Sequence, residues 1–168
     1  MGHKRPQDPG APSTTESFVP PKTMKPKILL LDDDVAIRQM LGRVLTREGY
    51  LVIPAATGEQ ALELSAAAEI DLILLDLNLP GQNGWDVFER LTAKDPLLPI
   101  IIITARANQL FVALGAGAGA LMEKPLDLPR LLQIIRDLLN EPVETRLARL
   151  AGKRAEFHYL PPKDDFAK

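Results

Sequence analysis

Side chains able to bind a metal ion and a phosphoryl group follow four apolar runs of this sequence. They are Asp32, Asp33 and Asp34 after residues 28–31, Asp76 after 72–75, Thr104 after 100–103, and Lys124 after 120–123. Carboxylates repel one another and are costly to desolvate, so several at the end of an apolar run need a compensating partner. Acid, hydroxyl and ammonium groups together indicate a metal and phosphoryl site along one edge of a sheet.

Alternating strands and helices are expected to position these groups. The expected strands are residues 27–32, 51–53, 71–76, a strand that opens after Pro99, and 119–122. The expected helices start at Asp34, at Thr57, before Trp85, near Arg106 and near Asp127; the first ends at Gly49, the second near Ala67 and the fourth near Gly115. Asp and Thr favour helix starts, and apolar residues recur at helical spacing behind them. Pro54 is expected to stop the second strand, which is typical of a sheet edge.

Five strands alternating with five helices predict an α/β fold with a doubly wound, five-stranded parallel sheet. The first, third and fourth strands are apolar throughout, as strands covered on both faces should be. Right-handed crossovers and two covered faces favour the strand order 2-1-3-4-5, with the switch point between the first and third strands. Ligands bind beside that point at the carboxyl ends, where Asp32, Asp33 and Asp76 lie.

Composition places this fold between two tails. The chain has 168 residues, a net charge of −2 and no cysteine, which argues against a general nucleic-acid binder and excludes disulfides and thiolate sites. Residues 1–26 are rich in Pro, Ser, Thr and Lys and are predicted to be a disordered arm, while 27–140 form the domain. No apolar stretch predicts a membrane span or a signal peptide, so a cytoplasmic protein is expected.

Residues 141–168 are expected to form a C-terminal extension, with one short helix after Pro142 and an extended tail. The aromatic cluster at 157–160 is the expected anchor if the tail docks on the domain or on a partner. Residues 161–168 are expected to be disordered. The extension is too short and too weakly apolar for a separate DNA-binding domain, so direct DNA binding is not expected.

Four stretches of this sequence, "ILLLDDD", "DLILLDLNLPGQNG", "IIITA" and "EKP", resemble the receiver domain of two-component response regulators. They occur in the receiver order and at receiver-like intervals across about residues 27–140. The resemblance is to the single-domain, chemotaxis-regulator-like members and implies a flavodoxin-like fold. Any one of the four stretches is common, and the four in register are specific.

The resemblance implies a phosphoacceptor and a Mg²⁺ site. Asp76 would take a phosphoryl group as an acyl phosphate, Thr104 would hydrogen-bond one phosphoryl oxygen, and Lys124 would pair with another. Asp33 and Asp76 would bind Mg²⁺ directly, Asp32 through a coordinated water, and Asn78 through its main-chain carbonyl. The Lys124-Pro125 bond would be a cis peptide that directs the ammonium into the site.

Plain structural roles compete with these assignments. Asp34 is assigned as a helix cap rather than a ligand. Thr104 could instead cap the helix near Arg106, and a lone lysine such as Lys124 is by default a solvated surface residue. Arg106 could face the site entrance beside Asn78 and affect access of water to the acyl phosphate, or it could project into solvent.

The chain departs from the family at Leu121, where receivers usually carry an aromatic residue or histidine. We therefore expect the usual movement of that ring with the threonine to be replaced by smaller motions. Phe111, Leu114 and Leu121 would form an apolar partner surface on the face made by the fourth helix, fifth strand and fifth helix. The implied phosphate donor is a histidine kinase or histidine phosphotransfer protein, because His3 and His158 lie in the tails.

The function expected from these residues is that of a single-domain response regulator that signals through protein–protein interaction or phosphorelay, with no turnover beyond its own phosphorylation and dephosphorylation. An aspartyl-phosphate phosphatase would usually carry a second aspartate where Asn78 stands. A receiver-like scaffold would be expected to have lost Asp76 or Lys124. A flavin-binding protein is disfavoured because the loop after the first strand is acidic.

Overall fold

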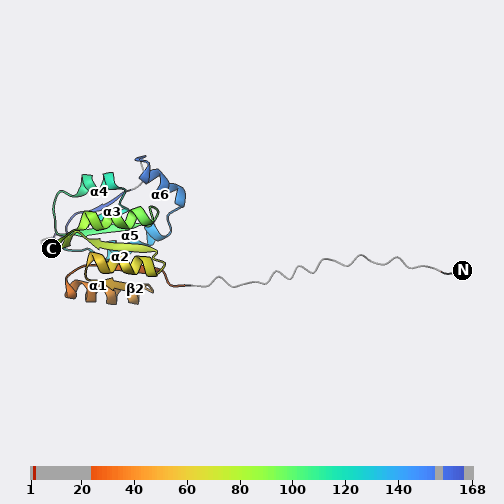
Figure 1. The fold of residues 1–168 in the computed structure, drawn as a ribbon, viewed down its shortest axis with the longest axis horizontal. Coiled ribbons are helices and arrows are strands. Elements are labelled where there is room, and N and C mark those ends of the chain that lie inside the picture. Colours follow the sequence, from red (N-terminus) through yellow and green to blue (C-terminus); the bar gives the residue numbers. More distant parts are fainter. Residues whose placement is uncertain (1, 3–23, 154–156, 165–168) are drawn as a thin grey trace.

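A six-stranded parallel sheet forms the centre of the computed structural model, which describes residues 2, 24–153 and 157–164. The strand order is β2-β1-β3-β6-β7-β8 (Figure 1). The strands are β1 Lys27–Leu31, β2 Leu51–Ala55, β3 Leu72–Asp76, β6 Ile100–Thr104, β7 Ala120–Glu123 and β8 His158–Leu160. The first five reproduce the predicted order 2-1-3-4-5. The predicted count of five was too low, because the C-terminal tail adds β8 to the sheet.

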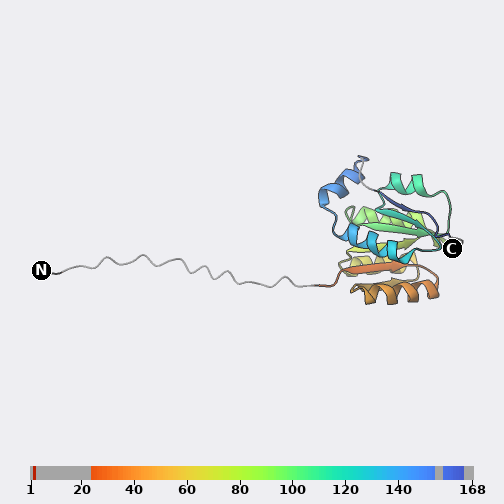
Figure 2. The same ribbon diagram turned by 180° about the vertical axis from the view of Figure 1, so that it is seen from behind.

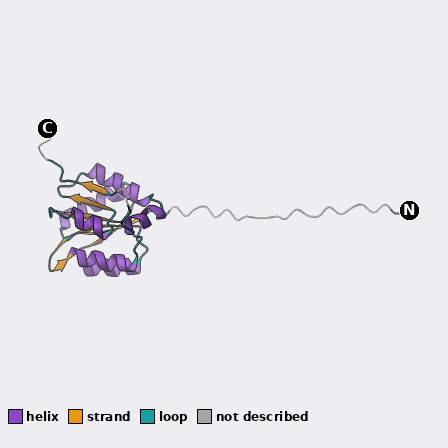
Figure 3. Ribbon diagram, turned by 90° about the horizontal axis from the view of Figure 1, so that it is seen from above, coloured by secondary structure: helices purple, strands orange, loops and turns teal. Residues whose placement is uncertain are grey.

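Helices cover both faces of the sheet (Figure 3). The helices of the domain are α1 Val35–Arg47, α2 Gly58–Ala67, α3 Gly84–Lys94, α4 Leu110–Ala116 and α5 Leu128–Leu139. One core cluster joins α1 and α5 to the sheet, and the other joins α2, α3 and α4 to its opposite face. The buried patterns of β1, β3 and β6 therefore follow from coverage on both sides.

Capping side chains set the start of four described helices. Asn83 caps α3 by accepting the Trp85 N–H, and the other three helices begin at the residues that the sequence predicts. Asp34 accepts the N–H groups of Ala36 and Ile37 at α1, Thr57 accepts that of Gln60 at α2, and Asp127 accepts that of Arg130 at α5. Each bond satisfies a backbone donor that has no partner within the helix.

Two predicted boundaries were wrong. The fourth helix starts at Leu110 instead of near Arg106, because Asn108 adopts a left-handed conformation with φ 63° and Gln109 offers no side-chain cap. Strand β2 continues through Pro54 to Ala55. Proline is tolerated there because β2 pairs only with β1 and lies at the edge of the sheet.

The chain beyond α5 packs on the domain. Helix α6, Val143–Leu150, is joined to it through Arg146, which donates to the carbonyls of Leu97 and Leu138 at 3.4 and 3.0 Å. Strand β8 returns alongside β7 (Figure 2). Of the residues predicted to be disordered, 1, 3–23 and 165–168 lie outside the described part of the chain. Within that part, no helix is long and apolar enough to cross a bilayer.

A two-stranded ribbon, β4 Asn78–Leu79 with β5 Gln82–Asn83, connects β3 to α3. At its end Gly84 lies against the backbone of Leu77, the residue after Asp76. A Cβ added to Gly84 would lie 2.5 Å from the Leu77 Cα and 2.7 Å from its carbonyl oxygen. The close approach leaves no room for a side chain.

Substitution of Gly84 by Ala is expected to lower the free energy of unfolding by about 1–3 kcal/mol, because the backbone next to Asp76 must move. Chemical denaturation measures the change. The matched control is Gly42→Ala in α1, where an added Cβ meets nothing within 4 Å. That control should be stabilised by about 0.5–1 kcal/mol, as expected for an open helix position. Equal stabilities for the two variants would contradict the inference that the backbone of Leu77 leaves no room for a side chain at Gly84.

Candidate functional site

Three carboxylates meet at the carboxyl end of the sheet. One oxygen from each of Asp32, Asp33 and Asp76 lies within 4.8 Å of the others. Asp32 and Asp76 are each only 2% exposed, whereas Asp33 is open to solvent. The pairing of β1 with β3 brings the two loops together, as the predicted strand order requires.

Hydrogen bonds fix the loop after β1. An Asp32 carboxylate oxygen accepts the N–H of Asp34 at 2.9 Å. The Arg38 guanidinium donates through Nη1 to the carbonyl oxygens of Asp32 at 2.7 Å and Asp33 at 3.0 Å. Arg38 is a site residue that the sequence analysis did not single out. The sequence feature that could have identified Arg38 is its position one turn after the cap Asp34, from which a long side chain can reach back over the start of the helix.

Lys124 reaches across the site and is not a solvated surface lysine. Its Nζ lies 3.0 Å from the Asp32 Oδ2 and 3.2 Å from the Asp76 Oδ2, and its side chain is 21% exposed. Burial by itself would lower the pKa of Lys124. The hydrogen bond to Asp32 and the charges of Asp76 and Asp32 outweigh burial and raise it, so the ammonium stays charged. The predicted cis Lys124-Pro125 peptide is present.

Asp76 occupies the centre of the site. Burial raises the pKa of its carboxyl group, and the charge of Asp32 acts in the same direction. The Asn78 N–H, which donates to Asp76 Oδ1 at 2.9 Å, and the Lys124 ammonium oppose that rise. A buried, crowded carboxylate of this kind is stabilised by added positive charge.

Thr104 and Arg106 border the site on the next strand. Thr104 is fully buried, and its Oγ1 accepts the N–H of Arg106 at 2.9 Å, so it does not cap α4, which begins at Leu110. Arg106 donates from Nε to the Asn78 Oδ1 at 2.6 Å, joining the loops after β6 and β3. The alternative that Arg106 only projects into solvent was therefore wrong.

The predicted apolar partner surface is only partly at the surface. Phe111 is 84% exposed and Leu114 is 44% exposed on α4. Leu121 is fully buried in the core, so its assignment to that surface was wrong. The physical reason is β8, whose Tyr159 pairs in register with Leu121 and closes this edge of the sheet.

The donor set fits a hard divalent cation. Three carboxylate oxygens lie within 4.8 Å of one another, two of them from nearly buried side chains. Such oxygens are the ligands that Mg²⁺ takes while keeping several waters. The Lys124 ammonium pairs with the carboxylates of Asp32 and Asp76. Asp32, Asp33 and Asp76 are thus able to hold such an ion.

Comparison with known proteins places this site in a family. Residues 28–136 match the model of the response regulator receiver domain. The chain is 34% identical over 118 residues to sporulation initiation phosphotransferase F of Bacillus subtilis, covering 69% of this chain and 95% of that protein. It is 45% identical over 95 residues to the transcriptional regulatory protein AfsQ1 of Streptomyces coelicolor, covering 56% of this chain and 42% of that protein.

Solved structures give the same result. A CheY-like receiver domain protein from Methanospirillum hungatei superposes with a TM-score of 0.67 and 32% identity, over 70% of this chain and 95% of that one. The regulator TrrA of Thermotoga maritima, solved with Mg²⁺-BeF, gives a TM-score of 0.63 and 31% identity, over 68% of this chain and 99% of that one. Strand order, acidic cluster and these matches agree: the chain belongs to the response regulator receiver domain family of two-component phosphorelay systems.

Proposed function

We propose that this chain is a single-domain response regulator whose Asp76 accepts a phosphoryl group from a histidine kinase or a histidine phosphotransfer protein. One observation carries the proposal. The nearly buried carboxylate of Asp76 lies between the Lys124 ammonium, at 3.2 Å, and two further carboxylates that could share a metal ion. That combination suits phosphoryl transfer to an aspartate.

The transfer is a single displacement at phosphorus. A carboxylate oxygen of Asp76 bonds to phosphorus while the phosphorus–nitrogen bond of a protonated phosphohistidine breaks, and the donor leaves as neutral histidine. Lys124 then pairs with a phosphoryl oxygen, and the Thr104 hydroxyl turns from the Arg106 N–H to donate to another. A Mg²⁺ ion would neutralise the charge that the three carboxylates and the phosphoryl group bring together.

The ligand roles differ among the acidic residues. Asp33 and Asp76 would hold the ion directly, together with the main-chain carbonyl of Asn78. Asp32 would act through a coordinated water, and its oxygens also accept hydrogen bonds from Lys124 and from the Asp34 N–H. The choice of metal is supported by TrrA, a response regulator of similar fold that was crystallised in complex with Mg²⁺-BeF.

Two alternative functions explain fewer of the contacts in the site. A phosphatase of the aspartyl-phosphate class would need a general acid near Asn78, whose side-chain oxygen instead accepts a hydrogen bond from Arg106. A scaffold that is never phosphorylated would not explain the cluster of Asp32, Asp76 and Lys124. Burying such charges costs desolvation free energy, which a purely structural role does not require.

Output through protein partners fits the chain better than direct DNA binding. The extension after α5 packs on the domain as α6 and β8, and the exposed Phe111 and Leu114 remain available on α4. The chain spans 42% of AfsQ1 and 56% of the DNA-binding response regulator MtrA of Mycobacterium bovis, but 95% of the sporulation phosphotransferase.

The test is incorporation of phosphate from acetyl phosphate, followed by intact mass and by cleavage with hydroxylamine, which attacks acyl phosphates. We expect one phosphoryl group per chain, dependent on Mg²⁺ and removed by hydroxylamine. Absence of incorporation with Mg²⁺, or incorporation that hydroxylamine leaves in place, would overturn the proposal.

The Arg106–Asn78 hydrogen bond should affect the lifetime of the acyl phosphate. With Arg106→Ala the entrance loses a side chain that bridges two loops, so hydrolysis should be faster by roughly threefold, a barrier change of under about 1 kcal/mol. The decay of phosphorylated protein after removal of the donor measures it. Arg43→Ala, an exposed position on α1, is the control and should decay as the wild type does. Equal or slower decay in Arg106→Ala would contradict the role.

A further inference from the structure

The C-terminal strand β8 closes the edge of the sheet beside the site. It runs parallel to β7, with His158, Tyr159 and Leu160 opposite Ala120, Leu121 and Met122. Leu160 is 2% exposed in the core cluster shared with α1 and α5, whereas Phe157 packs against the cluster on the opposite face. The strand and the residue before it therefore place side chains on both sides of the sheet. It lies beyond residue 136, where the family match ends.

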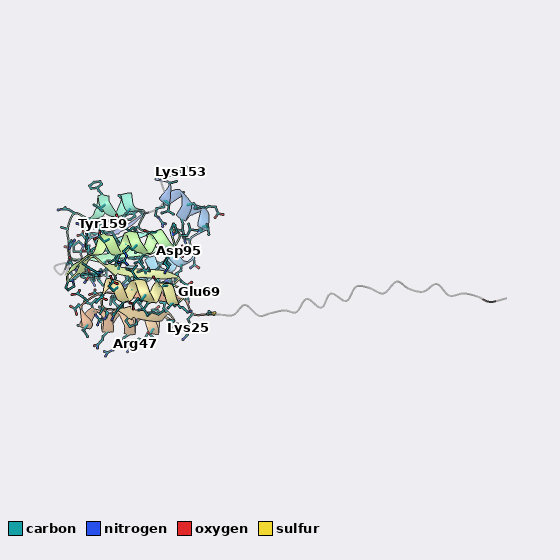
Figure 4. The ribbon with its side chains drawn as sticks, viewed as in Figure 1. Lys25, Arg47, Glu69, Asp95, Lys153 and Tyr159 are labelled. Atoms are coloured by element: carbon teal, nitrogen blue, oxygen red, sulfur yellow. The ribbon has the colours of Figure 1, made fainter. Side chains whose placement is uncertain are left out.

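Two hydrogen bonds tie this strand and its continuation to the segment Glu123-Lys124-Pro125. The Tyr159 hydroxyl donates to the Glu123 Oε1 at 3.1 Å, and the Lys163 N–H donates to the Pro125 carbonyl at 3.1 Å. Tyr159 lies toward the opposite end of the molecule from Lys25 and Glu69 (Figure 4), the end at which the strands finish. The tail thus holds the residues on either side of Lys124.

The phosphorylation site holds the same segment from its other side. The Lys124 Nζ bonds Asp32 and Asp76, and the Lys124 N–H donates to the Thr104 carbonyl at 2.8 Å. One tripeptide therefore connects the nucleophile Asp76 to the C-terminal strand. A displacement of the Lys124 backbone toward the site would move the Glu123 and Pro125 groups that Tyr159 and Lys163 contact.

We propose that β8 is a positioning element of the phosphorylation site, coupled to it through Glu123-Lys124-Pro125, so that phosphorylation of Asp76 loosens β8 and release of β8 favours phosphorylation. The proposal rests on the proposed function of Asp76. In the structure, β8 holds Lys124 where its ammonium pairs with two free carboxylates. A phosphoryl group on Asp76 replaces one of those partners and draws the ammonium to a new position, which the contacts of Tyr159 and Lys163 resist.

Thermodynamic linkage determines the direction in which β8 affects phosphorylation. If phosphorylation weakens the docking of β8, weaker docking must favour the phosphorylated state by the same free energy. Tyr159 is the residue at which the docking of β8 can be weakened without opening the core, because it is 39% exposed and its hydroxyl donates the hydrogen bond to Glu123. Leu160 supplies the buried part of the docking.

The first measurement is backbone amide hydrogen exchange of residues 157–163 in the full chain, with and without Mg²⁺ and beryllofluoride. Protection of β8 should fall about tenfold or more with the analogue, whereas amides of β1 should keep theirs. Asp76→Asn, which removes the acceptor, should show no change. Bound analogue, seen as a fluorine resonance of the complex, together with unchanged or slower exchange in β8, would overturn the inference and leave the proposed function intact.

The second measurement tests the effect of β8 on the affinity of the site for the phosphoryl analogue. Tyr159→Phe removes the bond to Glu123 and should raise the affinity for beryllofluoride in Mg²⁺ about fivefold, the equivalent of one hydrogen bond of about 1 kcal/mol. Leu160→Ala should act in the same direction. The control is Tyr50→Phe, at the other tyrosine of the chain, which should leave the affinity unchanged. Faster exchange in β8 of both variants without a gain in affinity would overturn the coupling. No binding to the wild type would overturn the proposed function and this inference together.

Discussion

Replacement of Asp76 by Asn is expected to abolish phosphorylation from acetyl phosphate, with a loss of at least about 100-fold and no response to beryllofluoride in Mg²⁺. The amide keeps the size and shape of the carboxylate but lacks the nucleophilic oxygen and the negative charge that attack on phosphorus requires. Intact mass measures the first effect. The fluorescence of Trp85, the single tryptophan of the chain, measures the second, because its indole N–H donates to Gln109 at the start of α4.

The same substitution should stabilise the unphosphorylated protein at neutral pH. Burial and Asp32 raise the pKa of Asp76 above its ordinary value of 3.8, so the fold favours the protonated form. Stability from this group is therefore present below pH 3.8 and is lost as the pH rises through the folded pKa. An uncharged amide avoids the loss, and the melting temperature of the variant should exceed that of the wild type without Mg²⁺. A melting temperature below that of the wild type would contradict repulsion between the Asp76 and Asp32 carboxylates.

Asp34→Asn is the matched control for both effects. Asp34 lies in the same loop cluster but caps α1 through the N–H groups of Ala36 and Ile37, a role that asparagine performs equally well. This variant should still be phosphorylated and should retain its helix. Loss of phosphorylation in Asp34→Asn would mean that total loop charge, rather than the Asp76 oxygen, governs the reaction.

Lys124→Met is expected to separate metal binding from signalling. The ammonium contacts the Asp32 and Asp76 carboxylates. If these carboxylates bind Mg²⁺ as proposed, the ammonium competes with the cation. Without it, Mg²⁺ affinity should rise about tenfold, the equivalent of about 1.4 kcal/mol for removal of one nearby positive charge. Beryllofluoride should nevertheless fail to change the exchange of β8, because no side chain connects the analogue to that strand. Calorimetric Mg²⁺ titration and hydrogen exchange measure the two effects.

The variant should also be less stable without metal. Removing one partner leaves two nearly buried carboxylates without their cation, and the expected loss is about 1–3 kcal/mol because Lys124 is itself partly exposed. Mg²⁺ should restore more stability to Lys124→Met than to the wild type. Lys94→Met, at the exposed end of α3, is the control and should show no such recovery. Unchanged Mg²⁺ affinity in Lys124→Met would contradict the competition.

The sequence predicted the elements that local chemistry controls. Apolar runs covered on both faces predicted the strands that end at Leu31, Asp76 and Thr104, and short polar side chains predicted the starts of α1, α2 and α5. The start of α4 was predicted four residues early, because Asn108 in a left-handed conformation carries no pattern that distinguishes it from a first helical turn.

Along this chain, residue type and spacing alone predicted the α/β fold, the order of the first five strands and the polar groups at their ends. The elements follow from alternation and capping, which act over a few residues, and the order follows from right-handed crossovers between strands covered on both faces. Only the tertiary structure decided that β8 pairs with β7, that Leu121 is buried and that Arg38 reaches the loop after β1. A three-residue strand has little preference of its own and forms where a free sheet edge meets an uncovered part of the core. Those two conditions exist only after the rest of the chain has folded.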